Sequence, residues 1–239
     1  MVRMLEHERR SRDEEEILSE EDKAYIREKF EKELVNEVPI KLIISDNCEY
    51  CYSIELLLKT LAKLSDGKIK LEIIDMTPEL SEKLKVNRGP IVLIGERGEV
   101  QYTGAPLGEE GWAFLETISI ASNKKHGLES YEKQLKELPK TVRVETIITP
   151  TCPYCPHAVL MANRIAIASE GRIVSDTIEA YEFPEIANKW NVTAVPTIVL
   201  SVEEPYSGEV FVIGLPREEQ LINAILKLAR GEQPYGAES

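Results

Sequence analysis

The chain has 239 residues, which suits one large or two small domains, and 43% of them are hydrophobic, enough to build a core and to argue against a disordered chain. Its formal net charge of −13 repels phosphate backbones and anionic lipid, so nucleic-acid and membrane binding are disfavoured. Four cysteines are too few for a disulfide-dense secreted scaffold. No apolar run approaches the ~20 residues of a membrane span, and the charged N-terminus does not resemble a signal peptide. We therefore expect a soluble, cytoplasmic protein, and the 30% of charged residues, rich in Glu and Lys, is typical of a thermophile.

The first half of the chain predicts a series of short alternating elements. Residues 1–18 are mostly charged and are expected to be partly disordered, and a capping-box-like start at Ser19 then opens a helix. The elements expected next are a strand at 39–46, a helix after Cys51, a strand at 68–75, a helix opened by Thr77 and Pro78, strands at 90–94 and 99–103, and a helix after 104–107.

The second half repeats this order, which indicates a tandem repeat. Its expected elements are a helix at 128–137, a strand at 141–149, a helix after Cys155, a strand at 172–179, a helix at 184–190, strands at 196–200 and 209–213, and a helix after 214–217 that ends near Gly231. A polar stretch that ends at Gly127 separates the halves. We predict a first unit over 19–126, a second unit over 127–231 and a tail over 232–239.

Each half places a Cys-x-x-Cys pair between a strand and an amphipathic helix. The pairs are Cys48 with Cys51 and Cys152 with Cys155, and their first cysteines lie 104 positions apart. A cysteine at a helix N-terminus meets unpaired N–H groups and the positive end of the helix dipole, which favour the thiolate. We expect Cys48 and Cys152 to attack disulfides, and Cys51 and Cys155 to resolve the mixed disulfides.

Two other interpretations of the cysteines stay open. Two Cys-x-x-Cys pairs could bind one zinc ion, but zinc sites usually separate their pairs by ~15–20 residues, far fewer than the interval here. The pairs could instead be structural disulfides, but closing so short a loop would add little stability.

The motif Cys-Pro-Tyr-Cys at 152–155, with Val195-Pro196-Thr197 further on, is similar to the active-site segments of glutaredoxins. Two such units in one chain resemble the glutaredoxin-like protein disulfide oxidoreductases of thermophilic archaea and bacteria, over about residues 20–231. This resemblance implies an α/β protein with two tandem thioredoxin-like folds, each with a central mixed β-sheet flanked by helices. It also implies thiol–disulfide exchange: the reduction, oxidation and isomerisation of protein disulfides.

The resemblance further implies two cis-prolines, Pro90 and Pro196, that face the cysteines and shape a substrate groove. The backbone of the residue before each, Gly89 or Val195, would pair with an extended substrate segment. An ordinary trans proline at the start of a strand is the alternative at both positions.

The chain departs from thioredoxin at one chemically important position. Thioredoxin has a buried Asp six residues before its first cysteine, and Leu42 and Thr146 stand there in this chain. Glu72 and Asp176 occupy matching positions in the two halves and are candidate replacements, although a solvent-exposed strand end is the simpler interpretation of both.

The two motifs also differ from each other. Glu49 places a negative charge between the first pair, whereas Pro153 occupies that place in the second. We therefore predict a lower pKa for Cys152 and a more oxidising second site. Tyr50 and Tyr154 are candidate contact residues, or rings packed on their own units.

His157 is either a tuning residue for the second pair or a surface histidine in the first helical turn.

The chemistry requires no metal and no bound cofactor, because the cysteine pairs carry the two electrons. The resemblance implies protein substrates with thiols or disulfides and a thioredoxin-reductase-like flavoprotein, which would supply electrons from NADPH. An alternative is an electron carrier to a peroxidase such as a peroxiredoxin. An alternative of another class is a peptide-binding or chaperone-like module with non-catalytic cysteines.

Overall fold

The computed structural model describes residues 17–46, 48–203 and 206–234. The first half contains α2 (Glu20–Glu33), β1 (Val38–Ile44), α3 (Cys51–Leu64), β2 (Ile69–Asp75), α4 (Pro78–Leu84), β3 (Ile91–Ile94), β4 (Val100–Thr103) and α5 (Glu110–Asn123). The second half contains α6 (Glu132–Lys136), β5 (Val142–Ile148), α7 (Cys155–Ala168), β6 (Ile173–Glu179), α8 (Pro184–Lys189), β7 (Thr197–Glu203), β8 (Tyr206–Ile213) and α9 (Glu218–Ala229). The predicted order of elements is confirmed in both halves.

The strands of both halves form one continuous sheet, in the order β2-β1-β3-β4-β6-β5-β7-β8. Within each half the first two strands are parallel and the last two pair antiparallel, so each half has the predicted mixed sheet. The halves join where β4 pairs in parallel with β6, in a register that runs from Val100 opposite Ser175 to Thr103 opposite Ile178. The predicted fold class is confirmed, and the merging of the two sheets is a feature that the sequence analysis did not anticipate.

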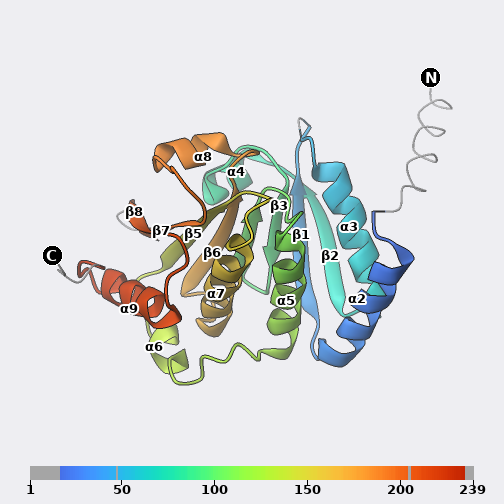
Figure 1. Ribbon diagram of the computed structural model, residues 1–239, viewed down its shortest axis with the longest axis horizontal. Helices are drawn as coiled ribbons and strands as arrows, with labels where there is room; N and C mark the ends of the chain where they lie inside the picture. Colours follow the sequence, from blue (N-terminus) through green and yellow to red (C-terminus); the bar gives the residue numbers. More distant parts are fainter. Residues whose placement is uncertain (1–16, 47, 204–205, 235–239) are drawn as a thin grey trace.

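Helices cover both faces of this sheet (Figure 1). The α5–α7 face carries α2, α3, α5 and α7, whereas α4 and α8 lie on the opposite face, the α4–α8 face. The buried side chains agree with this division. On the α4–α8 face, Leu84 of α4 clusters with strand residues of the first half, and Phe183 beside α8 clusters with strand residues of the second.

The predicted apolar faces of the helices form the core on the α5–α7 face. The buried residues of α3 recur at helical spacing, as expected of an amphipathic helix: Cys51, Ile54, Leu57, Leu58, Leu61 and Leu64. Their counterparts in α7, among them Val159, Ala162, Ile165 and Ala166, are fully buried. Burial of a large aliphatic side chain contributes about 1.5–3 kcal/mol, so these helices hold the cysteine pairs on a well-anchored framework.

Most predicted helix ends are also observed. Ser19 caps α2 in a capping box with Asp22, and Thr77 caps α4 with Pro78 at its first position. Gly231 has a positive φ of 78° directly after the C-cap residue of α9, as expected of a glycine in that place.

One predicted helix is shorter than expected. Instead of residues 128–137, α6 spans only Glu132–Lys136, because a turn in which the Tyr131 N–H donates to the Leu128 carbonyl occupies the preceding residues. The predicted unit boundary at 126/127 lies in the loop before this turn and stays a prediction.

Most of the predicted charged segment and tail falls on residues 1–16 and 235–239, outside the described residues. Of the helices that are described, none is both long and apolar enough to cross a membrane.

Candidate redox-active site

Both cysteine pairs lie at the N-termini of helices, as predicted. Cys51 is the first residue of α3 and Cys155 the first of α7, and each first cysteine lies in the loop before its helix. Each pair forms a disulfide, with Cα–Cα distances of 5.4 Å for Cys48–Cys51 and 5.5 Å for Cys152–Cys155. The sulfur atoms therefore lie where the unpaired N–H groups of the first helical turn converge.

The two sites differ in their exposure. Cys48 is partly exposed and Cys51 is 8% exposed, whereas Cys152 is 8% exposed and Cys155 is fully buried. In the second site the Cys155 N–H donates a hydrogen bond to the Cys152 sulfur, at 3.2 Å. A donor that points at this sulfur favours the thiolate over the thiol at Cys152.

The residues between the cysteines lie at the surface to different degrees. Glu49 and Pro153 are exposed, and the ring of Tyr154 is 66% exposed. Tyr50 is half-buried against the core, so the packed alternative describes it better.

His157 is exposed and its ring meets that of Trp112 at a centroid distance of 5.2 Å, which agrees with the prediction of a surface histidine.

The peptide bonds Gly89–Pro90 and Val195–Pro196 are both cis, as predicted. Gly89 lies directly against the first cysteine pair: a Cβ atom added to it would be 3.2 Å from the Cys51 sulfur and 2.4 Å from the carbonyl oxygen of Ile43. The equivalent position of the second unit, Val195, accommodates a branched side chain that packs against the core. The two proline loops thus share a backbone form but differ in the space beside the cysteines.

Asp176 and Glu72, the candidate proton acceptors, occupy very different environments. Glu72 is exposed and forms an ion pair with Lys41 at 3.2 Å, in agreement with a solvent-exposed strand. Asp176 is only 4% exposed, so the solvent-exposed interpretation is wrong for it. Its carboxylate accepts hydrogen bonds from Thr103, Gln101 and Arg143, at 2.8, 3.0 and 3.0 Å. The merged sheet causes this burial, because β4 covers the edge that β6 would otherwise expose.

Asp176 also points away from the cysteines. The neighbouring residue Ser175 donates to Asn163 of α7 at 2.7 Å, so Ser175 faces α7 and Asp176 faces the α4–α8 face. Burial raises the pKa of Asp176 to about 7 against the opposing effect of Arg143. The position of Asp176 gives no support to the prediction that it exchanges protons with Cys155.

A groove of about 550 Å³ extends between the two sites. Glu49, Tyr50 and Gly89 line it at the first site, and Pro150, two residues before Cys152, lines it at the second. The remaining lining residues are Arg88, Ala105, Leu107, Glu179, Tyr181, Glu182 and Phe183. Burial raises the pKa of Glu182 to about 7, and its carboxylate accepts the N–H of Ala105 at 2.6 Å.

Arg88 crosses between the units beside this groove. Its guanidinium donates to both carboxylate oxygens of Glu185, at 2.7 and 3.0 Å, and to the Glu182 carbonyl at 2.6 Å. It also lies 4.4 Å from the centre of the Phe183 ring. Most of the groove lining is aromatic or aliphatic, and with Arg88 paired in this way its remaining charged residues are the acidic Glu49, Glu179 and Glu182.

These features agree with known proteins. The thioredoxin domain family matches residues 142–227. A thioredoxin of Methanocaldococcus jannaschii is 34% identical over 86 residues, which make up 36% of this chain and 94% of that protein. The crystal structure of a protein disulfide oxidoreductase from Aeropyrum pernix K1 is 33% identical, with a TM-score of 0.80 over 90% of this chain and 95% of that one. The chain belongs to the thioredoxin-fold protein disulfide oxidoreductases.

This oxidoreductase also matches part of a longer protein. An alkyl hydroperoxide reductase component of Staphylococcus aureus is 31% identical over 142 residues, or 57% of this chain. The match spans only 27% of the length of that relative.

The oxidoreductase performs thiol–disulfide exchange, and its cysteine pairs carry the electrons. Each pair is bonded within itself, which gives a shared zinc site no support. Among the described residues, no group of three or more His, Cys, Asp or Glu side chains is placed to hold a metal ion. The alternative of a binding module with non-catalytic cysteines is less well supported than the redox function.

Sequence reasoning missed one buried residue of the oxidoreductase, Glu110. This first residue of α5 is fully buried, and neither carboxylate oxygen has a hydrogen-bond partner among the described residues. Burial, together with the charge of Glu109, raises the pKa of Glu110 to about 8. An acidic residue in a first helical turn is normally a solvent-exposed dipole partner, so the sequence carried no signal of this burial.

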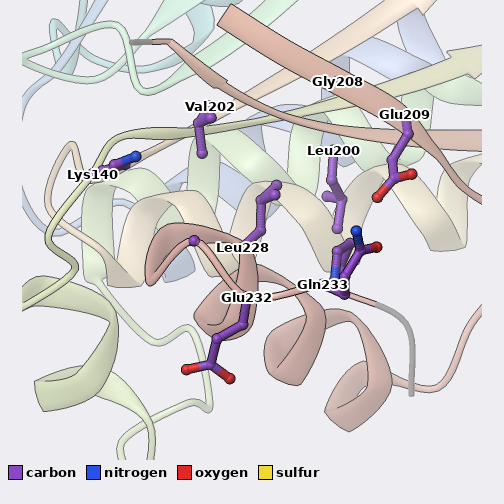
Figure 2. A pocket seen from close by; sticks show the side chains of 10 residues that line it. Lys140, Leu200, Val202, Gly208, Glu209, Leu228, Glu232 and Gln233 are labelled. Carbon is purple, nitrogen blue, oxygen red and sulfur yellow. The ribbon is translucent and has the colours of Figure 1, made fainter. Parts of the chain in front are cut away.

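A second cavity, of about 360 Å³, lies away from both cysteine pairs of the oxidoreductase (Figure 2). It lies between the end of α9 and the hairpin of β7 and β8, where Leu200, Val202 and Leu228 line it together with Lys140 and Glu209. None of the cysteines or cis-prolines contributes to this cavity, so it takes no part in the site.

Proposed function

We propose that Cys48 and Cys152 attack substrate disulfides and that Cys51 and Cys155 resolve the mixed disulfides. In each pair the first cysteine is the more exposed and the second begins the helix. The thiolate of the first cysteine forms a bond to one substrate sulfur and releases the other as a thiolate. The second cysteine, as a thiolate, then attacks the first and releases the remaining substrate thiolate. The substrate disulfide is reduced by two electrons, and the cysteine pair is oxidised.

The groove between the sites is proposed to hold the extended chain of a protein substrate. The backbones of Gly89 and Val195, beside the cis-prolines, are proposed to pair with that chain as an added strand. The single observation that best supports this function is that Gly89 lies against Cys51, because it places a backbone edge next to a reactive sulfur. The acidic lining favours substrate segments that carry Lys or Arg near the disulfide.

The second site is proposed to be the more oxidising of the two. The hydrogen bond from the Cys155 N–H to the Cys152 sulfur favours the Cys152 thiolate, and a thiolate that is stabilised in the reduced form makes the disulfide a stronger oxidant. Glu49 places a negative charge in the first motif where Pro153 is neutral.

The test is the reduction potential of each pair, measured with the other pair changed to serine. We expect the second site to lie tens of millivolts above the first, where ~30 mV corresponds to ~1.4 kcal/mol for two electrons. A first site that is equal to or higher than the second would contradict the asymmetry. Failure of both pairs to titrate as dithiols would contradict the proposed function itself.

A thioredoxin-reductase-like flavoprotein is proposed as the electron donor, and a cytoplasmic location is kept as a prediction. The similarity to an alkyl hydroperoxide reductase component favours one second candidate, electron transfer to a peroxidase such as a peroxiredoxin. An assay of NADPH oxidation with purified reductase distinguishes disulfide reduction from electron transfer to a peroxidase. The acceptor is insulin in one assay and a peroxiredoxin with peroxide in the other. Turnover with insulin alone would contradict the carrier function.

A further inference from the structure

The buried carboxyl group of Glu110 lies on the first unit but is enclosed at the junction with the second. Helix α5 packs along α7, and the α5–α7 face of the sheet lies beneath both helices (Figure 1). Neither oxygen of the Glu110 carboxyl group has a hydrogen-bond partner among the described residues. A buried carboxyl group without a partner is costly, which calls for a functional explanation.

The direction of the two helices and one hydrogen bond between them fix the level of Glu110 along α7. Helices α5 and α7 follow the parallel strands β4 and β5, so the two helices run in the same direction. The Asn163 side-chain amide donates to the Thr117 hydroxyl at 3.0 Å, which ties the middle of α7 to the middle of α5. Glu110 lies seven residues before Thr117, and Cys155 lies eight before Asn163. At about 1.5 Å per residue, Glu110 and Cys155 each lie about two helical turns before this hydrogen bond. The two residues are therefore at the same level along the paired helices.

The start of α5 is also attached to the loop that carries the second cysteine pair. The Glu109 N–H donates to the Pro150 carbonyl at 3.0 Å. A Cβ atom on Gly108 would be 2.4 Å from the same oxygen, so the two backbones are in close contact. Pro150 lies two residues before Cys152, and this contact independently places Glu110 at the second redox site.

Polar groups near Glu110 lie in its own unit, and one row of the sheet continues them toward the second unit. From β4, Tyr102 interacts with the Glu110 charge; from α5 itself, Glu109 adds a like charge. In the sheet register Tyr102 lies beside Thr177 of β6, and Thr177 beside Thr146 of β5. The hydroxyl groups of both threonines are buried and have no hydrogen-bond partner among the described residues.

Beyond Tyr102 the same row continues in the first unit through Val92, Leu42 and Ile73, whose side chains carry no polar group.

We propose that Glu110 is the proton acceptor for Cys155 and that the first unit thereby completes the second redox site. The proposal rests on the proposed role of Cys155 as the resolving thiol. Once a substrate is bound to Cys152, the Cys155 thiol passes its proton to the Glu110 carboxylate. The Cys155 thiolate attacks the Cys152 sulfur, the Cys152–Cys155 disulfide forms, and the last substrate sulfur leaves as a thiolate.

The proton and charge balance of this step agrees with the oxidised structure. The proton stays on Glu110 while the disulfide is present, and it returns to Cys155 when the pair is reduced. A pKa of about 8 keeps the carboxyl group protonated at neutral pH in this state. The carboxylate thus becomes neutral as the buried thiol is consumed, so no charge is added to the interior during the reaction.

The test uses Glu110→Gln in full-length protein whose first pair is changed to serine. The probe is 5,5′-dithiobis(2-nitrobenzoic acid), which releases one coloured thiolate on attack by Cys152 and a second on resolution by Cys155. We expect an unchanged first phase and a second phase slowed about a hundredfold at pH 7, the low end for loss of a general base. The slowed second phase should regain about tenfold per pH unit, because it then depends on thiolate formed by solvent.

Glu218→Gln is the matched control, because Glu218 begins the equivalent helix α9 but is partly exposed and paired with Arg164 at 2.9 Å. It should leave both phases unchanged. Equal second phases in wild type and Glu110→Gln across the pH range would overturn the proposal, and so would equal slowing of both phases. Cys155→Ser tests the role of Cys155 separately from that of Glu110. If this variant does not trap a mixed disulfide at Cys152, the proposed function of Cys155 is wrong.

A second measurement needs no variant and stands if Glu110→Gln does not fold. The pKa of Glu110 is followed by carbon-13 NMR in the oxidised and in the fully reduced wild-type protein. We expect a value near 8 with the disulfide present and a different value once the Cys155 thiol stands beside it. Identical titration curves in both states would overturn the proposal.

Discussion

A methyl group added to Gly89 is expected to damage the first redox site and spare the second. In Gly89→Ala the new Cβ atom would lie 2.4 Å from the Ile43 carbonyl oxygen, 3.1 Å from the Ile44 Cα atom and 3.2 Å from the Cys51 sulfur. The first two obstacles are backbone atoms of β1, which cannot rotate away. The Gly89 N–H also donates to the Ser45 hydroxyl at 3.1 Å, so the loop is held on both sides.

The sign of the stability change tests this reasoning. Where space is free, Gly→Ala stabilises a protein by about 0.4–1 kcal/mol through the unfolded chain. Overpacking costs about 1–3 kcal/mol, and a rigid obstacle places Gly89 at the upper end. We expect the free energy of unfolding of Gly89→Ala to fall by about 2–2.6 kcal/mol, the difference between these two effects.

Urea denaturation of the oxidised protein measures this change, and insulin reduction with one pair at a time measures the sites. The first site should lose at least about tenfold in rate, since a shift of the loop misplaces the substrate backbone beside Cys51. Val195→Ala is the control, because its position already accommodates a side chain. An unchanged or increased stability of Gly89→Ala, with a normal first site, would refute the steric argument.

The remaining predictions concern the two buried carboxyl groups. Burial raises the pKa of Glu110 to about 8, so the folded protein keeps a proton that the unfolded chain has lost, and stability should fall by about 1.4 kcal/mol per pH unit between pH ~5 and ~8. Glu110→Gln should remove this fall, so its stability relative to wild type should grow by about 3–4 kcal/mol over that pH range. Urea denaturation at several pH values measures this, and parallel plots of stability against pH for the two proteins would contradict it. Asp176→Asn should leave the rate of the second redox site within about twofold of normal, because Asp176 faces the α4–α8 face. The same change should lower the free energy of unfolding by about 3 kcal/mol at pH 8, because it removes the carboxylate that pairs with Arg143. A large loss of second-site rate with normal stability would show that its orientation has been misread.

The local signals in the sequence were sufficient for the elements and the cysteine sites. Apolar spacing in α3 and α7, the caps at Ser19 and Thr77, and each Cys-x-x-Cys motif depend on residues close in the chain. The helix N-termini then place the sulfur atoms without any long-range information. For this reason the two Cys-x-x-Cys sites could be predicted from local signals, whereas both cis-prolines were predicted from the resemblance to a known family.

What the sequence could not reveal depends on contacts between the two halves. Asp176 and Glu72 occupy matching positions, and only the pairing of β4 with β6 makes one buried and the other exposed. Glu110 has the appearance of an ordinary first-turn acid, and the packing that buries it leaves no signal in the residues around it in the chain. No periodicity within one unit records what the other unit covers, so the different burial of Glu72 and Asp176 emerged only from the structure.

The pairing of β4 with β6 also determines what would happen if the repeat were divided. Each half would regain an open sheet edge, with a row of N–H and C=O groups ready to pair with any other strand. The cut would also take from Asp176 the hydrogen bonds of Gln101 and Thr103, because both donors belong to β4 of the other half. Although the halves share one sequence pattern, neither is a self-sufficient copy of the other, and aggregation through the bared strands is the expected fate of either half alone.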